Sequence, residues 1–290
     1  MARYEIDGKV VLITGAAQGI GRDRARRLAK RGARLALVDR DTEGLESAVA
    51  AIGGEAEPFV ADVTDTESIT GAIAAARDRF GGIDVCLASA GISGMPKPAT
   101  LVTPEEFEQV IQVNLLGVWR TLSACLPDVV ERQGYLLPIA SLAAAVPTPL
   151  IVAYGASKVG VHSIGRTLRF ELAHTGAKVG VAYFAEIDTA MTQEAYKVPV
   201  VDRAVKSIPK GLRKIYPVEV ASAAIVRGIE RRSRRVCVPR WVSWTVSWNG
   251  LGGPIEALAA RDPRFVRNLK QAQAEAEAEA TAPQAEEVPR

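Results

Sequence analysis

The chain has 290 residues, of which 48% are hydrophobic, and its formal net charge is only +3. This composition supports one large α/β domain with a sizeable core, and the near-neutral charge gives no sign of a nucleic-acid partner. No run of about 18 apolar residues occurs, so we expect no segment that spans a bilayer. Three widely separated cysteines and two histidines offer no metal-ligand spacing, and the free thiols suit a reducing compartment, the cytoplasm.

The first expected strand, at 9–14, is followed by the glycine-rich turn TGAAQGIG and then by a helical pattern. A short, β-branched strand of this kind is typical of a buried parallel sheet. Glycines between strand and helix allow a tight turn, and the helix N-terminus offers N–H groups to a diphosphate. The order predicts a dinucleotide-binding turn, with a plain strand-to-helix turn as the alternative; its residues are Gly15, Gln18, Gly19, Ile20 and Gly21.

The second expected strand, at 34–38, ends on Asp39. A carboxylate about 20 residues after such a turn is typically placed to bind the adenosine ribose hydroxyls, and it repels a 2′-phosphate. Asp39 therefore favours NAD over NADP, although the adjacent Arg40 could bind that phosphate and soften the preference. The alternative is that Asp39 simply precedes the next helix, which Asp41 could cap.

Strands and helices continue to alternate along the chain. Further strands are expected at 57–63, 83–89, 135–141, 178–184 and 236–238. This alternation predicts a Rossmann-type, doubly wound, mostly seven-stranded parallel sheet with helices on both faces. Asp62 and Val63, at the end of the third strand, are placed to contact the edge of an adenine ring.

The stretch SLAAAVPTPLIVAYGASK contains a possible proton-transfer site. Tyr154 and Lys158 are four residues apart, so they share one face of a helix, and Ser141 lies at the end of a strand. A free phenol has a pKa of about 10, and a nearby ammonium lowers it into the range useful for acid–base catalysis. The serine hydroxyl can bind the substrate oxygen. Alone, this tyrosine–lysine spacing is also common on helix surfaces.

Taken together, these motifs resemble the short-chain dehydrogenase/reductase family over about 9–239. In that family a tyrosine is the general acid/base, a lysine lowers its pKa and binds the nicotinamide ribose, a serine orients the substrate and an asparagine holds a relay water. The resemblance assigns these catalytic roles to Tyr154, Lys158, Ser141 and Asn114. It also implies cofactor contacts by Tyr154 and Lys158 themselves and by Ala90, Gly91, Ile187 and Thr189.

Three positions depart from the family pattern. Ala88-Ser89 replaces an Asn-Asn pair after the fourth strand, so an amide that braces the centre of the sheet is absent. Phe184-Ala185 replaces the Pro-Gly that opens the nicotinamide loop. Pro138 falls within the fifth strand and removes one ladder donor. None of these changes removes a catalytic group.

We expect one domain over 1–250 with an irregular lid at about 190–217, where a long structureless stretch is otherwise uncommon. Apolar candidates for the pocket walls hint at a lipophilic alcohol or ketone, although ordinary loop packing explains them as well. They are Met191, Tyr196 and Val198 on the lid and Leu142, Val146 and Leu150 opposite.

The C-terminal part is basic and rich in tryptophan, with eleven Lys/Arg against two acids over 203–240. Trp241, Trp244 and Trp248 can share a helical face. They could pack on the domain, lie in an oligomer interface or contact a membrane surface, in that order of preference. Residues 251–290 form an extension whose last ~20 residues are low in complexity and expected to be disordered.

The sequence thus predicts an NAD(P)-dependent oxidoreductase that transfers a hydride between nicotinamide and a secondary alcohol or carbonyl, with NAD as the favoured cofactor. The alternatives are a non-catalytic dinucleotide-binding scaffold or sensor and an NADP-linked carbonyl reductase. The family resemblance also implies a homodimer or homotetramer built on the helices around Asn114 and Tyr154.

Overall fold

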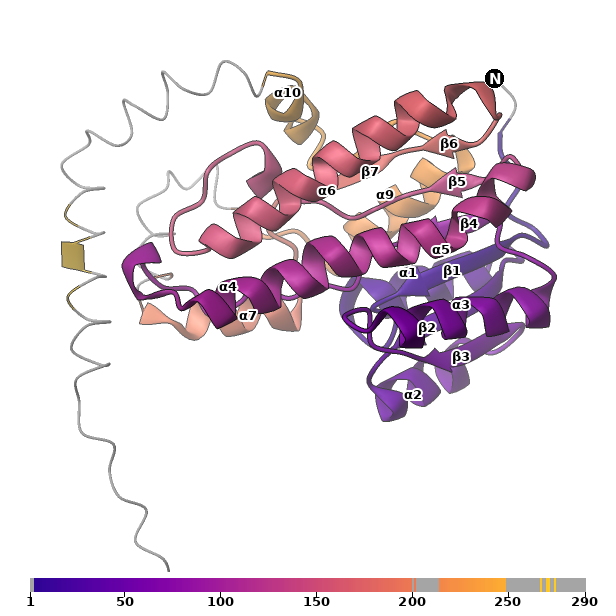
Figure 1. Cartoon of the computed structure of the whole chain (residues 1–290), viewed down its shortest axis with the longest axis horizontal. Helices are drawn as coiled ribbons and strands as arrows, with labels where there is room; N and C mark the ends of the chain where they lie inside the picture. The colour runs from indigo at the N-terminus through magenta and orange to yellow at the C-terminus, as the bar shows by residue number, and fades with distance from the viewer. Residues whose placement is uncertain are drawn as a thin grey trace, which may run out of the picture.

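The computed structural model describes residues 3–199, 201, 214–248, 267, 270–271 and 274. Its centre is a parallel sheet of six strands in the order β3-β2-β1-β4-β5-β6 (Figure 1). This order is the doubly wound arrangement expected from the sequence. The strands are β1 Val10–Thr14, β2 Arg34–Asp39, β3 Ala56–Val60, β4 Val85–Leu87, β5 Tyr135–Leu136, β6 Lys178–Val179, β7 Val181–Phe184 and β8 Arg235–Val238.

Helices cover both faces of the sheet and bury one apolar cluster on each side (Figure 1). α1 and α9 pack against each other on one face, and α3, α5 and α6 cover the other. The helices are α1 Gly19–Ala29, α2 Thr42–Ile52, α3 Thr66–Phe80, α4 Pro104–Ile111, α5 Gly117–Glu131, α6 Val152–Glu171, α7 Ala190–Lys197, α9 Val218–Glu230 and α10 Val242–Ser247.

The strand count differs slightly from the expected single sheet of seven. The predicted sixth strand is divided at Gly180 into β6 and β7, and β7 pairs with β8 as a separate two-stranded sheet. The Tyr135 side chain occupies the space beside Gly180 and donates a hydrogen bond to the Ser233 carbonyl at 2.7 Å. β5 is also short, because Pro138 has no N–H for a regular ladder.

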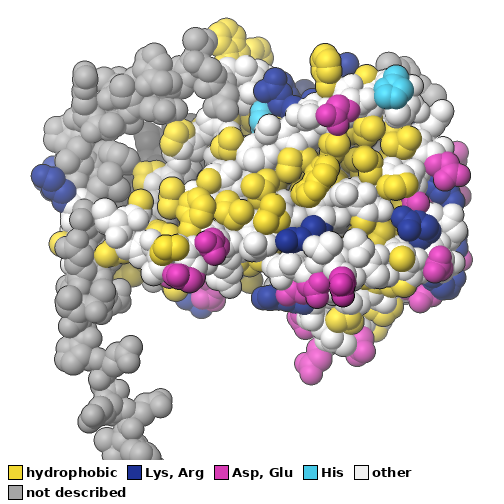
Figure 2. Space-filling model, in the orientation of Figure 1, with side chains coloured by type: hydrophobic (Ala, Val, Ile, Leu, Met, Phe, Trp, Pro, Cys, Tyr) yellow, Lys and Arg dark blue, Asp and Glu magenta, His cyan; other side chains and the backbone are white. Residues whose placement is uncertain are grey.

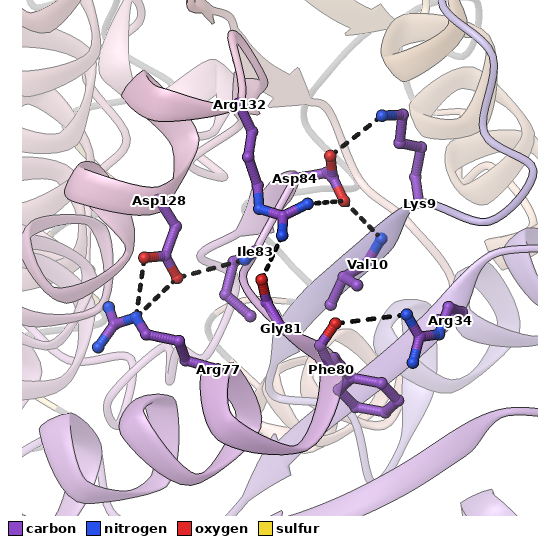
Figure 3. A network of polar contacts seen from close by, with 10 residues as sticks. All are labelled: Lys9, Val10, Arg34, Arg77, Phe80, Gly81, Ile83, Asp84, Asp128 and Arg132. Carbon is purple, nitrogen blue, oxygen red and sulfur yellow. Dashed lines mark hydrogen bonds and ion pairs between the residues drawn. The ribbon is translucent and has the colours of Figure 1, made fainter.

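The amino ends of the central strands are fixed by a polar network (Figure 3). The Asp84 carboxylate, just before β4, accepts from Lys9 Nζ at 3.2 Å and from the Val10 backbone N–H at 3.0 Å. Arg132 lies 3.6 Å from the same carboxylate. The opposite edge, where the strands have their carboxyl ends, is where ligands bind in open α/β sheets.

The helical segment around Asn114 is not one continuous α-helix. A π-helical turn at Gln112–Leu116 separates α4 from α5 and places Asn114 inside the protein, where it is fully buried. Single-turn π-bulges are frequently found at functional sites. The α4 helix begins at a capping box of Thr103 and Glu106.

The expected lid and C-terminal extension are described only in part. The lid begins as the helix α7 rather than as irregular chain, while residues 202–213 of it lie outside the described residues. The extension at 251–290 also lies outside them, apart from 267, 270–271 and 274. Trp244, on α10, is 71% exposed, so packing on the domain, the first of the three alternatives, does not describe this side chain. No helix in the described ranges is both long and apolar enough to cross a bilayer.

Candidate active site

A cavity of about 830 Å³ lies along the carboxyl ends of the central strands. It runs from the glycine-rich turn after β1 to Tyr154 at the start of α6. All of the predicted cofactor-contacting residues line it: Gly15, Gln18, Gly19, Ile20, Gly21, Asp39, Arg40, Asp62, Val63, Ala90, Gly91, Tyr154, Lys158, Ile187 and Thr189. Ser141 lines it as well, whereas Asn114 lies behind its wall.

At two positions of the glycine-rich turn, Gly15 and Gly21, a side chain has no room. Gly15 has a φ of +69°, and a Cβ there would lie 3.0 Å from the Ala90 backbone. A Cβ on Gly21 would lie 1.9 Å from the Gly15 carbonyl oxygen. α1 therefore begins directly on the turn, and its first turn carries no acidic residue. The N-terminus of α1 is thus free to offer its N–H groups and partial positive charge to an anion.

Asp39, at the end of β2, is not paired with a described cation. The Asp39 carboxylate accepts from the Ala17 backbone N–H at 3.0 Å and forms no ion pair with a described residue. Arg40 instead lies 3.7 Å from the Asp62 carboxylate, and its side chain is 70% exposed. The Thr64 backbone N–H, followed by smaller effects that include Arg40, lowers the pKa of Asp62. This arrangement leaves Asp39 available to ribose hydroxyls.

Tyr154, Lys158 and Ser141 meet at the other end of the cavity. Tyr154 lies in the first turn of α6, and Lys158 Nζ lies 5.5 Å from the centre of its ring. Lys158 is buried and donates to the Ile139 carbonyl at 3.0 Å. Ser141 caps the short 3-10 helix Leu142–Ala144 and accepts from the Ala143 N–H at 3.2 Å. A phenol, a hydroxyl and an ammonium in this arrangement can exchange a proton with a bound oxygen.

The pKa of Tyr154 is not lowered by the neighbouring ammonium of Lys158, although the sequence led us to expect this. Burial lowers the pKa of Lys158 to about 8. Burial also raises the pKa of Tyr154, and a hydrogen bond with Ser141 opposes that rise. The ammonium lies over the face of the phenol ring and is bound to the Ile139 carbonyl, so in this structure desolvation outweighs its effect on the phenol.

Asn114 holds the wall behind the site. Its side-chain amide exchanges two hydrogen bonds of 2.8 Å with the backbone of Ile92 and donates to Ser157 Oγ at 3.2 Å. A Cβ on Gly91 would lie 3.1 Å from the Asn114 oxygen and 3.6 Å from Lys158 Nζ. The buried asparagine therefore has the partners that burial demands, and its side chain acts here as a positioning group.

The part of the cavity around Tyr154 and Ser141, which we call the substrate half, is mostly apolar. Five of the six predicted wall residues line it, namely Leu142, Val146, Leu150, Met191 and Tyr196, whereas Val198 does not. Glu186, which was not predicted as a site residue, lines the same half and accepts a hydrogen bond from the Tyr196 hydroxyl.

Arg24 was not predicted as a site residue either. It is 1% exposed and lines the part of the cavity beside the glycine-rich turn, which we call the cofactor half. Its position offered a signal, because it lies with Gly21, Ala25 and Leu28 on the buried face of α1. Charged residues are rarely buried without a partner. Among the described residues no group of three or more metal-binding side chains occurs.

Comparisons with known proteins agree with this geometry. Residues 9–199 match the family model described as short chain dehydrogenase. D-threitol dehydrogenase of Mycolicibacterium smegmatis is 35% identical over 226 residues, which cover 77% of this chain and 86% of the relative.

Two solved structures resemble the fold. The 3-ketoacyl-(acyl-carrier-protein) reductase of Brucella melitensis, complexed with NADH, is 30% identical with a TM-score of 0.73, covering 80% of this chain and 97% of that one. An NAD+-bound xylitol dehydrogenase is 25% identical with a TM-score of 0.75, covering 81% and 99%.

Proposed function

The chain belongs to the short-chain dehydrogenase family, and from that premise we propose that it is an NAD-linked oxidoreductase acting on a secondary alcohol or its ketone. The observation that carries the proposal is the cavity itself, which joins a diphosphate-type glycine turn to the Tyr154–Lys158–Ser141 group. The cavity residues fit a nicotinamide dinucleotide, since the free N-terminus of α1 suits its diphosphate and Asp39 suits its ribose. When bound, that cofactor supplies or accepts the hydride.

The protein's own residues would handle the proton. Tyr154 gives its hydroxyl proton to the carbonyl oxygen in reduction and takes the alcohol proton in oxidation. Ser141 donates a hydrogen bond that fixes the same oxygen. Lys158 stabilises the phenolate by its charge, and with a pKa of about 8 it carries only half of that charge at pH 8.

For the cofactor, we propose a preference for NAD over NADP. Asp39 has no cationic partner in the part of the chain that the structure describes and would repel a 2′-phosphate, while Arg40 is paired with Asp62. Direct titration of the purified protein with NADH and with NADPH tests this: tighter NADH binding is expected. Tighter NADPH binding would contradict it and favour carbonyl reduction.

For the substrate, we propose a lipophilic alcohol or ketone, because aliphatic side chains dominate the walls around Tyr154. A sugar alcohol is the second candidate, since the Glu186 carboxylate lines the same walls and two similar proteins are named as threitol and xylitol dehydrogenases. Parallel assays with 2-octanol and with xylitol and NAD separate the two: the ratio of their kcat/KM values should favour 2-octanol.

The decisive test of the reaction is Tyr154→Phe. This variant should bind NADH as the wild type does, while kcat falls by about 10²–10⁴-fold or more, as expected for the loss of an acid–base group. Tyr183→Phe is the matched control, because its hydroxyl is bound to His162 and does not line the cavity. Activity retained by the Tyr154 variant would overturn the assignment in favour of a scaffold or sensor.

We also propose that the chain forms a homodimer or homotetramer through α5 and α6. Figure 2 shows a band of hydrophobic side chains across this face. Trp119 on α5 and Val152, Val159 and Phe170 on α6 are exposed, and Phe170 is 89% exposed. Large exposed apolar patches mark interfaces. Light scattering should give a multiple of 30.9 kDa for the wild type and a smaller mass for Val159→Glu.

Finally, the three free cysteines at Cys86, Cys125 and Cys237 are compatible with the reducing environment of the cytoplasm, which we propose as the site of action.

A further inference from the structure

Arg24 is a buried cation without an acidic partner. It lies in α1, just below the glycine-rich turn, and only 1% of it is exposed. Among residues 3–199, 201 and 214–248 no carboxylate forms an ion pair with it, and its Nε has no hydrogen-bond partner. Burial lowers the pKa of its guanidinium. Burying a cation in this way is costly, so the charge needs a reason to be there.

The guanidinium lies at the joint between the carboxyl ends of β1 and β4. Its Nη2 donates to the Thr14 carbonyl at 3.4 Å and to the Ser89 hydroxyl. Ser89 is itself joined to Thr14, through a backbone N–H to hydroxyl bond of 3.0 Å and through its own hydroxyl. Ser89 is one of the positions at which the sequence departs from the family pattern, where a larger amide side chain stands. In this chain the Ser89 hydroxyl accepts the hydrogen bond from Arg24.

We propose that Arg24 provides the buried positive charge that binds the diphosphate of the dinucleotide, while its Nη2 braces β1 against β4. This inference rests on the proposed function, because it takes the ligand of the cavity to be a dinucleotide. Arg24 lines the cavity together with Gly15 and Gly21, and α1 places its N-terminal partial charge at the same end. An uncompensated cation and a helix N-terminus both favour an anion at one place.

The neighbouring charges do not neutralise this site. Asp23, the next residue in sequence, pairs with Arg27 at 2.7 Å and with Arg26 at 3.1 Å, so its carboxylate is already engaged. Asp39 is bound to the Ala17 N–H rather than to Arg24. The guanidinium therefore has no anionic partner among the described residues, and a bound diphosphate would provide one.

The rival explanation is that Arg24 only braces the sheet. Two variants separate the explanations. Arg24→Gln removes the charge and keeps an N–H donor for Thr14 and Ser89, whereas Arg24→Lys keeps the charge and loses the planar fork. A third variant, Arg24→Met with Ser89→Asn, restores an amide at the joint and removes the charge, which keeps the test valid if Arg24→Gln folds poorly.

The experiment measures binding rather than turnover. ADP-ribose, which carries the diphosphate without nicotinamide, and adenosine, which carries no phosphate, are titrated into the purified proteins by calorimetry, and the melting temperature of each protein is recorded. Arg24→Gln and the double variant should bind ADP-ribose about 10- to 100-fold more weakly, as for a lost hydrogen bond to a charged group. Adenosine binding should stay unchanged, and Arg24→Lys should retain ADP-ribose affinity within a few-fold.

The ligand-free Arg24→Gln protein should also melt no lower than the wild type, because an unpaired buried charge has been removed. ADP-ribose affinity equal to that of the wild type in both uncharged variants would overturn the proposal and leave Arg24 as a brace. The proposed function fails separately: the wild type itself would then bind neither ADP-ribose nor NADH.

Discussion

The two edges of the central sheet differ in whether their buried charged side chains are paired with an opposite charge. At the amino edge, each buried carboxylate has cations beside it (Figure 3). Asp84 is bound by Lys9 and Arg132, and Asp128 accepts from Arg77 Nε at 2.8 Å and from the Ile83 N–H at 3.2 Å. Among the described residues, both of these carboxylates therefore have a cationic partner.

At the carboxyl edge, the buried charged side chains are the cations Arg24 and Lys158, and neither forms an ion pair with a described acidic residue. Arg24 is bound only to a carbonyl and a hydroxyl, and Lys158 donates to the Ile139 carbonyl. Burial lowers the pKa of both groups. Such charges reduce the stability of the ligand-free protein, and active sites commonly carry this cost. We therefore propose that the amino edge stabilises the fold, whereas the carboxyl edge binds an anionic ligand and the reacting oxygen of the substrate.

The largest expected effect is that of Lys158→Met at the carboxyl edge. Loss of the charge that stabilises the phenolate of Tyr154 should lower kcat/KM by about 10²–10⁴-fold. The matched control is Lys9→Met, which removes a lysine from the amino edge and should leave kcat/KM unchanged. Steady-state kinetics of both variants checks the contrast, and similar losses in the two would break it.

The same variant gives a pH test. The pKa of Lys158 is about 8 in the folded protein and 10.5 ordinarily, so the unfolded state binds more protons between these values. The stability of the wild type relative to Lys158→Met should then rise with pH across this window, by on the order of 2 kcal/mol between about pH 8 and pH 9.5. Urea unfolding at the two pH values measures it. A difference that stays constant or falls would show that the lysine is not desolvated.

Asp84→Asn tests the amino edge from the opposite side. It weakens the acceptor of the Val10 N–H and removes the partner of two half-exposed cations, so we expect a loss of about 1–3 kcal/mol in the free energy of unfolding. The Kd of the folded protein for NADH should not change. A variant that unfolds normally but binds NADH weakly would contradict the division between the edges.

Local sequence rules predicted most of the cofactor half. The strand, glycine turn and helix that contain Gly15 and Gly21 are specified by short-range geometry, and Asp39 follows at a fixed spacing, so their positions could be deduced. Arg24 could not, because the pattern of α1 shows that a charge lies on its buried face but not which group it meets. That depends on Ser89, which is 65 residues away.

The substrate half was harder to predict for the same reason. Glu186 was not predicted to line the cavity, although it directly follows the altered pair Phe184-Ala185. Its partner Tyr196 lies on α7, where irregular chain was expected. The interruption of the helix at Asn114 was also not predictable from propensity, since a π-bulge is a response to tertiary contacts such as those with Ile92.

Asp39→Ala is expected to have an intermediate effect. Asp39 is an acid of the carboxyl edge that no described cation neutralises, so its removal should weaken NADH binding and leave or improve NADPH binding. The ratio of the two Kd values should shift toward NADPH by about tenfold or more. Arg40→Ala is the control and should leave NADH binding unchanged. An unaltered ratio in Asp39→Ala would mean that the carboxylate only caps the Ala17 N–H.

The smallest effect is expected in the substrate half, from Tyr196→Phe. The hydroxyl of Tyr196 binds Glu186, so it links α7 to the chain after β7 at the wall of the cavity. The net value of one such hydrogen bond is about 1 kcal/mol, which corresponds to a few-fold change. Because none of the predicted cofactor-contacting or catalytic residues is altered, NADH affinity and kcat should stay as in the wild type while KM for the alcohol rises a few-fold. A matched change in Glu186→Gln, with no further rise in the double variant, would show that the two side chains act as one unit. Additive effects would instead mean that Glu186 meets the substrate directly, and that result would favour a polyol over a lipophilic alcohol.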